Sequence, residues 1–334
     1  MHLNQINCEY IGFSSTLENP SLSRIHKINQ DYLSIYEGVY GKLFIISRGI
    51  GESGAEIISH LAVVSIVNYF KTLPQSFVIE QSINDSFQFA TTEVLSYLAK
   101  HKWLNIAGAS IALLLSSQNQ VYLAHAGDCR IYLIRDKKIN LLTSEHVTFI
   151  NSDKLNKNLS KQSNIESTLS VNNINLKTID NTIGLSIIEP AIIGPFDLYK
   201  NDHIILATKG VYQRLTRFEL LNSVINTNEV IVTNKDFKDC ITDKIVQKNT
   251  NSISLELFLR KIWELAKNRN AKEDFSLIII KINHAPDLPE HPSLQKKEKT
   301  KFFFLLILFL SSLLFLVYTI LPLLFSLYNS IVYR

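Results

Sequence analysis

The segment that most constrains the fold runs from Val121 to Arg135 and reads Val-Tyr-Leu-Ala-His-Ala-Gly-Asp-Cys-Arg-Ile-Tyr-Leu-Ile-Arg. β-branched and aromatic residues fill both arms, and Gly127-Asp128 separates them, which is the pattern of two strands joined by a tight turn. The same alternation of strand and turn extends over residues 108–143. The sequence therefore predicts a β-hairpin at the centre of a β-rich region.

Length and composition allow a globular protein with a sizeable core. The chain has 334 residues, and about 285 of them precede a very apolar C-terminal stretch, which is enough for one large domain or two small ones. Hydrophobic residues make up 46% and charged residues 19%. The formal net charge is only +4, and no segment forms a dense basic stripe, so we expect no nucleic-acid partner.

The cysteines and the N-terminus indicate a reducing compartment. Cys8, Cys129 and Cys240 are far apart and odd in number, which fits neither a disulfide framework nor a zinc cluster. Such cysteines are typical of reduced cytosolic proteins, where they serve as small apolar residues. The first residues lack an apolar signal region, so we expect that the N-terminal part is not secreted.

Hydrophobic periodicity predicts further elements on both sides of the central region. A Gly-rich turn over residues 46–51 leads from a predicted hairpin into a predicted helix. The predicted strands are Cys8–Phe13, Tyr32–Tyr36, Lys42–Ser47, Asp202–Thr208 and Phe275–Ile282, and the predicted helices are Glu52–Phe70, Ile79–Lys100, Arg217–Val224 and Ser254–Asn268.

A polar segment, residues 145–180, interrupts this pattern. It is rich in Asn, Ser and Lys and shows little periodicity, so it is predicted to be a long loop or a partly disordered insertion. Two interpretations remain open, namely a flexible flap without function and a flap that takes part in recognition.

The C-terminal region predicts a membrane anchor. Residues 284–301 form a Pro- and Lys-rich linker, and residues 302–333 contain no charged side chain, which is long enough for one transmembrane helix over 302–328. A buried core helix is the alternative. Four lysines precede the apolar run and only Arg334 follows it, so the positive-inside rule predicts a cytoplasmic N-terminal domain and an outside C-terminus. Pro322 is expected to kink or end the helix.

Short motifs along residues 10–283 connect these elements to chemistry. The chain carries His26-Lys27-Ile28-Asn29-Gln30-Asp31, then Arg48-Gly49-Ile50-Gly51, then Gly127-Asp128-Cys129-Arg130, followed by Thr143-Ser144-Glu145-His146, Thr208-Lys209-Gly210 and Glu273-Asp274-Phe275-Ser276. In their order and in the strands and helices around them, these segments resemble the motifs of the metal-dependent type 2C (PPM) protein serine/threonine phosphatases.

The resemblance implies a fold and a reaction. The fold is an α+β four-layer sandwich, in which two antiparallel sheets are flanked by helices, within one domain over residues 1–283. The family hydrolyses phosphoserine and phosphothreonine with two Mg²⁺ or Mn²⁺ ions. Carboxylates hold these ions, which activate a bridging water for in-line attack on phosphorus. Hard oxygen ligands are needed because two dications about 4 Å apart repel each other.

This chain departs from the family at most of the metal-binding positions. Arg48 stands in place of the bridging Asp, and Lys209 replaces the Asp of Ser-Asp-Gly. The other departures are Gln30 for Glu, Glu273 for the last ligand Asp, and His26 for the phosphate-binding Arg, whereas Asp31, Asp128, Gly49 and Gly210 keep the family's residue type.

A charge count shows what these departures do. In the family, six acidic positions and two dications leave a formal charge of about −2. Here the four carboxylates of Asp31, Asp128, Glu273 and Asp274 with the two cations Arg48 and Lys209 give the same sum. Because a guanidinium or ammonium group repels a dication and neutralises carboxylates, the sequence predicts a site without metal or other cofactor, held by salt bridges.

Three interpretations of this degenerate site remain open. The cluster keeps a decayed site folded, or it binds a phosphorylated or acidic partner through Arg48, Lys209 and His26, or it retains some catalysis. We expect an inactive, phosphatase-like regulatory or scaffold protein that is anchored in a membrane and binds a phosphoprotein, a kinase or a membrane assembly. The alternatives are an active protein serine/threonine phosphatase with unusual metal ligands, and a membrane component whose domain is only a folded spacer.

Overall fold

The computed structural model describes the following parts of the chain: residues 6–16, 28–38, 40–51, 54–74, 76–102, 107–117, 120–144, 146–150, 176–179, 181–185, 188–225, 245–249, 253–267, 269, 273–284, 322, 327 and 328. The chain divides into two compact units, Met1–Pro286 and Asp287–Arg334. All the elements described below belong to the first unit.

Two antiparallel sheets form the centre of the first unit. In spatial order, the five-stranded sheet contains β10 (Ala191–Phe196), β5 (Gln120–Ala126), β4 (Gly108–Ser117), β3 (Gly41–Ile50) and β2 (Asp31–Gly38). The six-stranded sheet contains β12 (Ile245–Asn249), β1 (Asn7–Ser15), β13 (Phe275–His284), β11 (His203–Ala207), β6 (Arg130–Arg135) and β7 (Lys138–Leu141). A separate two-stranded sheet pairs β8 (Val147–Ile150) with β9 (Leu176–Ile179).

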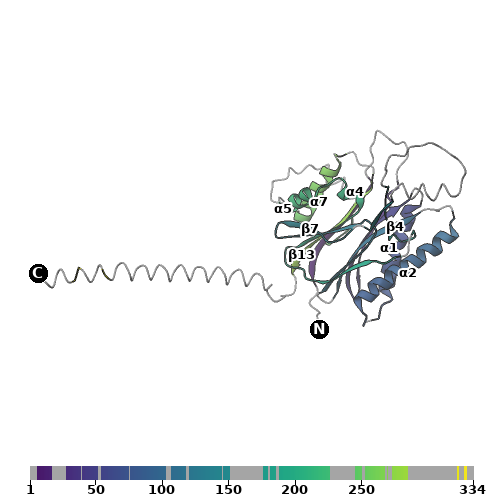
Figure 1. The fold of residues 1–334 in the computed structure, drawn as a ribbon, viewed down its shortest axis with the longest axis horizontal. Coiled ribbons are helices and arrows are strands. Elements are labelled where there is room, and N and C mark those ends of the chain that lie inside the picture. Colours follow the sequence, from purple (N-terminus) through teal and green to yellow (C-terminus); the bar gives the residue numbers. More distant parts are fainter. Residues whose placement is uncertain are drawn as a thin grey trace. The chain divides into compact units, whose positions relative to one another are not determined.

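Helices cover the outer faces of the two large sheets (Figure 1). The five-stranded sheet packs against α1 (Ala55–Lys71) and α2 (Ile79–Lys100), and the six-stranded sheet packs against α5 (Arg217–Ile225) and α7 (Ile253–Lys267). The short helix α4 (Lys209–Tyr212) directly follows β11. The described layers are therefore helices, sheet, sheet and helices, as the resemblance implied.

Alternation along the strands divides the core into three clusters. In β3, Leu43 and Ile45 face α1 and α2, whereas Phe44 and Ile46 face the other sheet. Successive side chains of a strand point to opposite faces, and here both faces are covered. This explains why the central strands are continuous apolar runs and show no alternation of apolar and polar residues.

The prediction of a hairpin between Val121 and Arg135 is wrong in its pairing. Both strands and the turn at Gly127-Asp128 are present, but β5 pairs with β4 and β10, while β6 pairs with β11 and β7. The turn therefore carries the chain from one sheet to the other. Gly and Asp signal a reversal of the backbone, but they do not determine which strand becomes the hydrogen-bonded neighbour.

The other element predictions agree closely with the structure. The helix predicted over Ile79–Lys100 is α2 with the same bounds, and the hairpin predicted from Tyr32–Tyr36 and Lys42–Ser47 is formed by β2 and β3. Strands β10 and β12 were not predicted. The predicted insertion, residues 145–180, contains the β8–β9 pair at its ends, and residues 151–175 lie outside the described residues.

The predicted linker and membrane helix lie almost entirely outside the described residues. The exceptions are His284 and residues 322, 327 and 328. Among the helices that the structure describes, none combines the length and the apolar character needed to cross a membrane. The membrane anchor therefore stays a prediction.

Candidate functional site

One end of the two facing sheets brings together most of the predicted site residues. The side chains come from the last residues of β3, from the first residue of β2 and the residue before it, from the turn between β5 and β6, from the start of α4 and from the residues before β13. The residues that these segments carry here are Gln30, Asp31, Arg48, Gly49, Asp128, Lys209, Glu273 and Asp274. His26 lies outside the described residues.

Arg48 lies at the centre of the charged cluster. Its Nη1 atom is 3.2 Å from Oδ2 of Asp128, and its Nη2 atom is 3.4 Å from Oε2 of Glu273. The side chains of Arg48 and Asp128 are only 13% and 5% exposed. Burial alone would lower the pKa of Arg48, but the carboxylates of Asp128 and Glu273 outweigh it and raise that pKa. The guanidinium group therefore stays charged and joins two carboxylates from distant segments.

Lys209 completes a second ion pair with the same glutamate. Its Nζ atom is 3.3 Å from Oε1 of Glu273, and the two side chains are 27% and 36% exposed. Burial tends to raise the pKa of Glu273, but Arg48 and Lys209 outweigh this effect, so the pKa lies below its ordinary value. Each oxygen of Glu273 therefore contacts a different cation.

Asp31 is a buried member of the cluster. It is opposite Arg48 in the register of β2 and β3, yet Oγ1 of Thr208 is the group that donates a 2.7 Å hydrogen bond to its Oδ2. Burial raises the pKa of Asp31 to about 7, although the bond from Thr208 opposes this shift. Near neutral pH this carboxyl group is thus only partly ionised.

The two retained glycines allow the backbone segments to approach closely. The backbone N–H of Gly49 donates to the carbonyl of Gln30 at 2.9 Å, and a Cβ atom on Gly49 would lie 2.5 Å from the carbonyl oxygen of Ala55. A Cβ on Gly210 would lie 1.8 Å from the carbonyl oxygen of Asp274. These positions cannot accept a side chain without moving the segments that carry Arg48 and Lys209.

Local hydrogen bonds hold the turn that carries Asp128. Oγ of Ser110 accepts bonds from the backbone N–H groups of Asp128 at 2.7 Å and Cys129 at 2.8 Å. The hydroxyl of Tyr212, at the end of α4, donates to the carbonyl of Asp128 at 3.0 Å. The turn is therefore connected both to β4 and to the helix that begins with Lys209.

Two further contacts complete the cluster, and one of them involves Arg214, which was not predicted as a site residue. The backbone N–H of Gln30 donates to Oδ2 of Asp274 at 2.8 Å. Arg214 is buried and donates from Nη2 to the carbonyl of Glu273, while its Nε and Nη1 atoms have no hydrogen-bond partner among the described residues. No local sequence pattern singles out Arg214, because only the approach of the α4 region to β13 brings it here.

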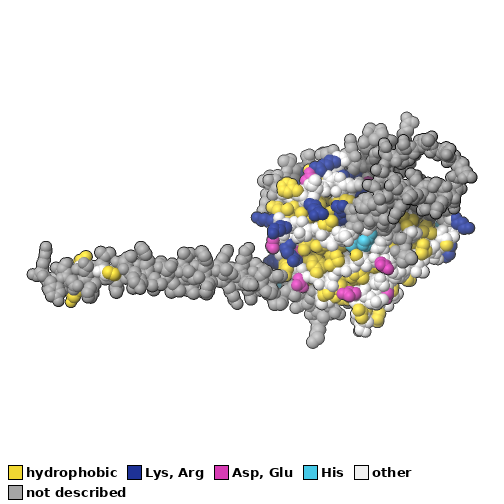
Figure 2. All heavy atoms as spheres, viewed as in Figure 1, with side chains coloured by type: hydrophobic (Ala, Val, Ile, Leu, Met, Phe, Trp, Pro, Cys, Tyr) yellow, Lys and Arg dark blue, Asp and Glu magenta, His cyan; other side chains and the backbone are white. Residues whose placement is uncertain are grey.

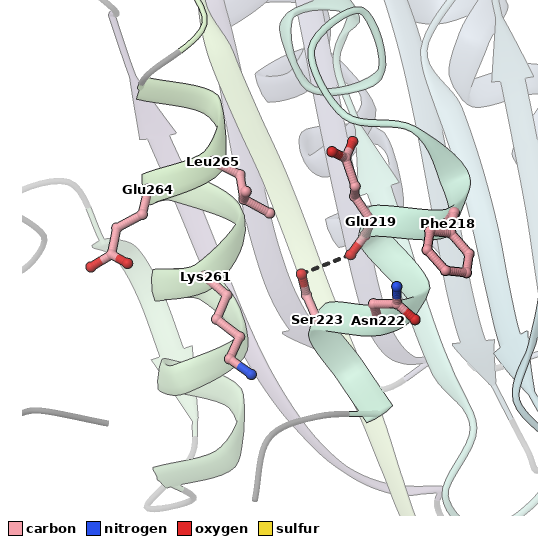
Figure 3. Close-up of a pocket in the computed structure, with 7 residues that line it drawn as sticks. All are labelled: Phe218, Glu219, Asn222, Ser223, Lys261, Glu264 and Leu265. Atoms are coloured by element: carbon pink, nitrogen blue, oxygen red, sulfur yellow. Dashed lines mark hydrogen bonds between the residues drawn. The ribbon is translucent and has the colours of Figure 1, made fainter. Parts of the chain in front are cut away.

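Among the residues that the structure describes, no group of three or more His, Cys, Asp or Glu side chains is arranged to hold a metal ion. A cavity of about 600 Å³ lies between α5 and α7, away from the charged cluster, and none of the predicted site residues lines it (Figure 3). Its lining residues are Phe218, Glu219, Asn222, Ser223, Lys261, Glu264 and Leu265.

Comparison with solved structures defines the class of fold. The chain has the PPM phosphatase-like architecture of the Mycobacterium tuberculosis serine/threonine phosphatase PstP/Ppp, with a TM-score of 0.56 and 14% identity over 83% of this chain and 99% of that one. The S. agalactiae serine/threonine phosphatase gives a TM-score of 0.57 and 18% identity over 83% and 100%. A PstP catalytic domain with two manganese ions gives 0.56 and 14% over 83% and 100%.

Sequence comparison supports the same family. The profile of the family Protein phosphatase 2C matches residues 42–151. The serine/threonine phosphatase stp of Listeria monocytogenes is 27% identical over 128 residues, which are 37% of this chain and 51% of that protein. The chain thus spans about half the length of the curated relatives that it matches. Together these matches support homology to PPM-type serine/threonine phosphatases.

Proposed function

We propose that this chain is a catalytically inactive, phosphatase-like protein that works by binding. The observation that carries the proposal is the position of the Arg48 guanidinium group, which contacts both Asp128 and Glu273. In the family that the chain resembles, these positions serve two dications. The residues present here do not fit that purpose, because the mostly buried guanidinium group of Arg48 already lies between the carboxylates.

The charge balance of the cluster supports the same proposal. Lys209 neutralises the outer oxygen of Glu273, and burial leaves Asp31 only partly ionised near neutral pH. A metal site needs several ionised oxygen ligands directed at one point. We therefore propose that the charged cluster works without Mg²⁺, Mn²⁺ or another cofactor, and that no bridging water is activated there.

The proposed task is regulation or scaffolding at a membrane. The cations Arg48 and Lys209 make an acidic or phosphorylated protein, a kinase or a membrane assembly the expected partner. On the face drawn in Figure 2, Lys and Arg side chains are scattered among acidic and apolar ones. The apolar residues 302–328 are proposed as the anchor, with the phosphatase-like domain in the cytoplasm.

Hydrolysis and metal titration test the proposal on the full chain. The L. monocytogenes phosphatase serves as the positive control in an assay of a phosphoserine peptide with millimolar Mn²⁺. We expect no Mn²⁺-dependent hydrolysis by this chain and no heat of Mn²⁺ binding in calorimetry. Turnover that depends on Mn²⁺ and disappears in Asp128→Asn would show instead that the chain is an active phosphatase with unusual ligands.

A further inference from the structure

Glu273 is the most exposed charged residue of the cluster, and it connects Arg48 to Lys209. Its side chain is 36% exposed, whereas those of Arg48 and Asp128 are 13% and 5% exposed. Its Oε2 atom lies 3.4 Å from Nη2 of Arg48, and its Oε1 atom lies 3.3 Å from Nζ of Lys209. Glu273 therefore occupies positions on both cations that an anionic ligand would need, although the side chain of Lys209 is itself 27% exposed.

The contacts of Glu273 are weak for ion pairs. Charge-assisted N–H···O bonds are usually about 2.7–2.9 Å long, so both contacts exceed that range. Pairs that remain this accessible to water contribute little to stability. Turning the Glu273 side chain into solvent therefore costs little, because water can replace both contacts, while the buried pair between Arg48 and Asp128 remains in place.

Release of Glu273 would leave Lys209 without the carboxylate that it contacts and Arg48 with Asp128 alone. The buried Arg214 donates to the carbonyl of Glu273, and two of its nitrogen atoms lack hydrogen-bond partners among the described residues, so it adds positive charge next to the same segment. The vacated position would therefore face two cations, and it is suited to an anion with enough acceptor oxygens to contact both.

We infer that Glu273 is an internal competitor for a phosphoryl group, which displaces it from Arg48 and Lys209. A phosphoserine or phosphothreonine side chain carries about −1.5 to −2 charges and three acceptor oxygens, compared with one charge and two oxygens for the glutamate. The phosphoryl group can therefore contact both cations and replace the negative charge and the two acceptor oxygens of Glu273. The inference deepens the proposed function and rests on it, since it names a phosphorylated segment of a partner protein as the ligand and Glu273 as the group that regulates its entry.

The substitution Glu273→Gln tests the competition directly. Glutamine has nearly the same shape but no charge, so it competes less with an anion. The full chain is titrated with a phosphoserine peptide that has no other charged side chain, and binding is followed by calorimetry. We expect Glu273→Gln to bind this peptide at least about tenfold more tightly than the wild type. The unphosphorylated peptide is expected to bind neither protein.

A matched control separates this effect from the general change in net charge. Glu264 on α7 is also exposed and pairs with Arg260 at 3.0 Å, but it lies outside the charged cluster. Glu264→Gln makes the same change in net charge and should leave peptide affinity unchanged. Combining Glu273→Gln with Lys209→Met should remove the gain, and Glu273→Ala should reproduce it. Circular dichroism checks that each variant is folded.

The outcomes distinguish this inference from the proposed function. Equal affinity of wild type and Glu273→Gln, an equal gain in Glu264→Gln, or equal binding of the unphosphorylated peptide would each refute the competition, while leaving the absence of catalysis intact. Mn²⁺-dependent hydrolysis by the wild type would overturn both. Tighter binding that requires the phosphoryl group, Lys209 and the loss of the Glu273 charge supports the competition.

Discussion

The double substitution Arg48→Asp with Lys209→Asp tests whether internal ion pairs hold the site together. It removes the contact of Arg48 with the nearly inaccessible Asp128, and breaking a buried pair in this way costs about 3–5 kcal/mol. The pair between Lys209 and Glu273 is partly exposed and adds about 1 kcal/mol at most. We therefore expect the free energy of unfolding to fall by about 3–6 kcal/mol, a large part of the usual 5–15 kcal/mol.

Urea unfolding of the full chain, followed by circular dichroism in EDTA, measures this loss. Lys248→Asp is the matched control, since it makes the same kind of change at the exposed pair of Lys248 with Glu256 and should cost about 1 kcal/mol or less. The double variant collects six carboxylates, so Mn²⁺ should restore part of its stability, by about 2.7 kcal/mol at a hundred times the dissociation constant. If the double variant is as stable as the wild type in EDTA, the internal ion pairs do not hold the site.

Three further predictions concern buried groups of the same domain. Burial raises the pKa of Asp31 from 3.8 to about 7, so its contribution to stability is fully present below about pH 4 and is lost as the pH rises towards 7. Urea unfolding should therefore show that the free energy of unfolding declines by up to about 4 kcal/mol over this range, and Asp31→Asn should abolish the decline. An unchanged decline in the variant would contradict this origin. Gly210→Ala should lower the free energy of unfolding by at least about 3 kcal/mol, since its Cβ would lie 1.8 Å from a backbone oxygen of Asp274. The control Gly12→Ala should cost much less, because the closest contact of its Cβ is a flexible leucine side chain. Similar losses in the two variants would refute the steric explanation. Burial raises the pKa of the Cys129 thiol, so iodoacetamide at pH 8 should leave Cys129 unmodified in the native protein and modify it in urea. Peptide mapping measures both. Labelling of the native protein would show that the turn opens.

The parts of the fold that sequence reasoning placed correctly are those with strong local signals. Helix α2 has an amphipathic pattern over its whole length, and β2 and β3 are bounded by glycines that mark their turn. Strand β12 was missed because its sequence, Ile-Val-Gln-Lys-Asn, is polar in its second half and lies at the edge of its sheet. Its pairing with β1 makes it a strand, and no local pattern indicates that pairing.

The candidate site likewise has residues that the sequence indicated and a residue that only the packing of distant segments brings in. The order of the motifs indicated that Arg48, Asp128, Lys209 and Glu273 lie near one another. In the structure, Arg48 pairs with Asp128 and Glu273, and Glu273 pairs with Lys209. The contribution of Arg214 could not be foreseen, because it depends on how closely the α4 region approaches the residues before β13.

The sequence alone determined the chemical types at the site, because each replacement of a carboxylate by a cation is visible in the printed residues. It also determined the positions of most strands and helices, because periodicity and turn residues act over short distances. Only the tertiary structure decided which strands pair on either side of Gly127-Asp128, that Asp31 is buried enough to be partly protonated, and that Glu273 lies partly exposed between two cations. These properties depend on burial and on contacts between distant segments, and neither is encoded in any single stretch of the chain.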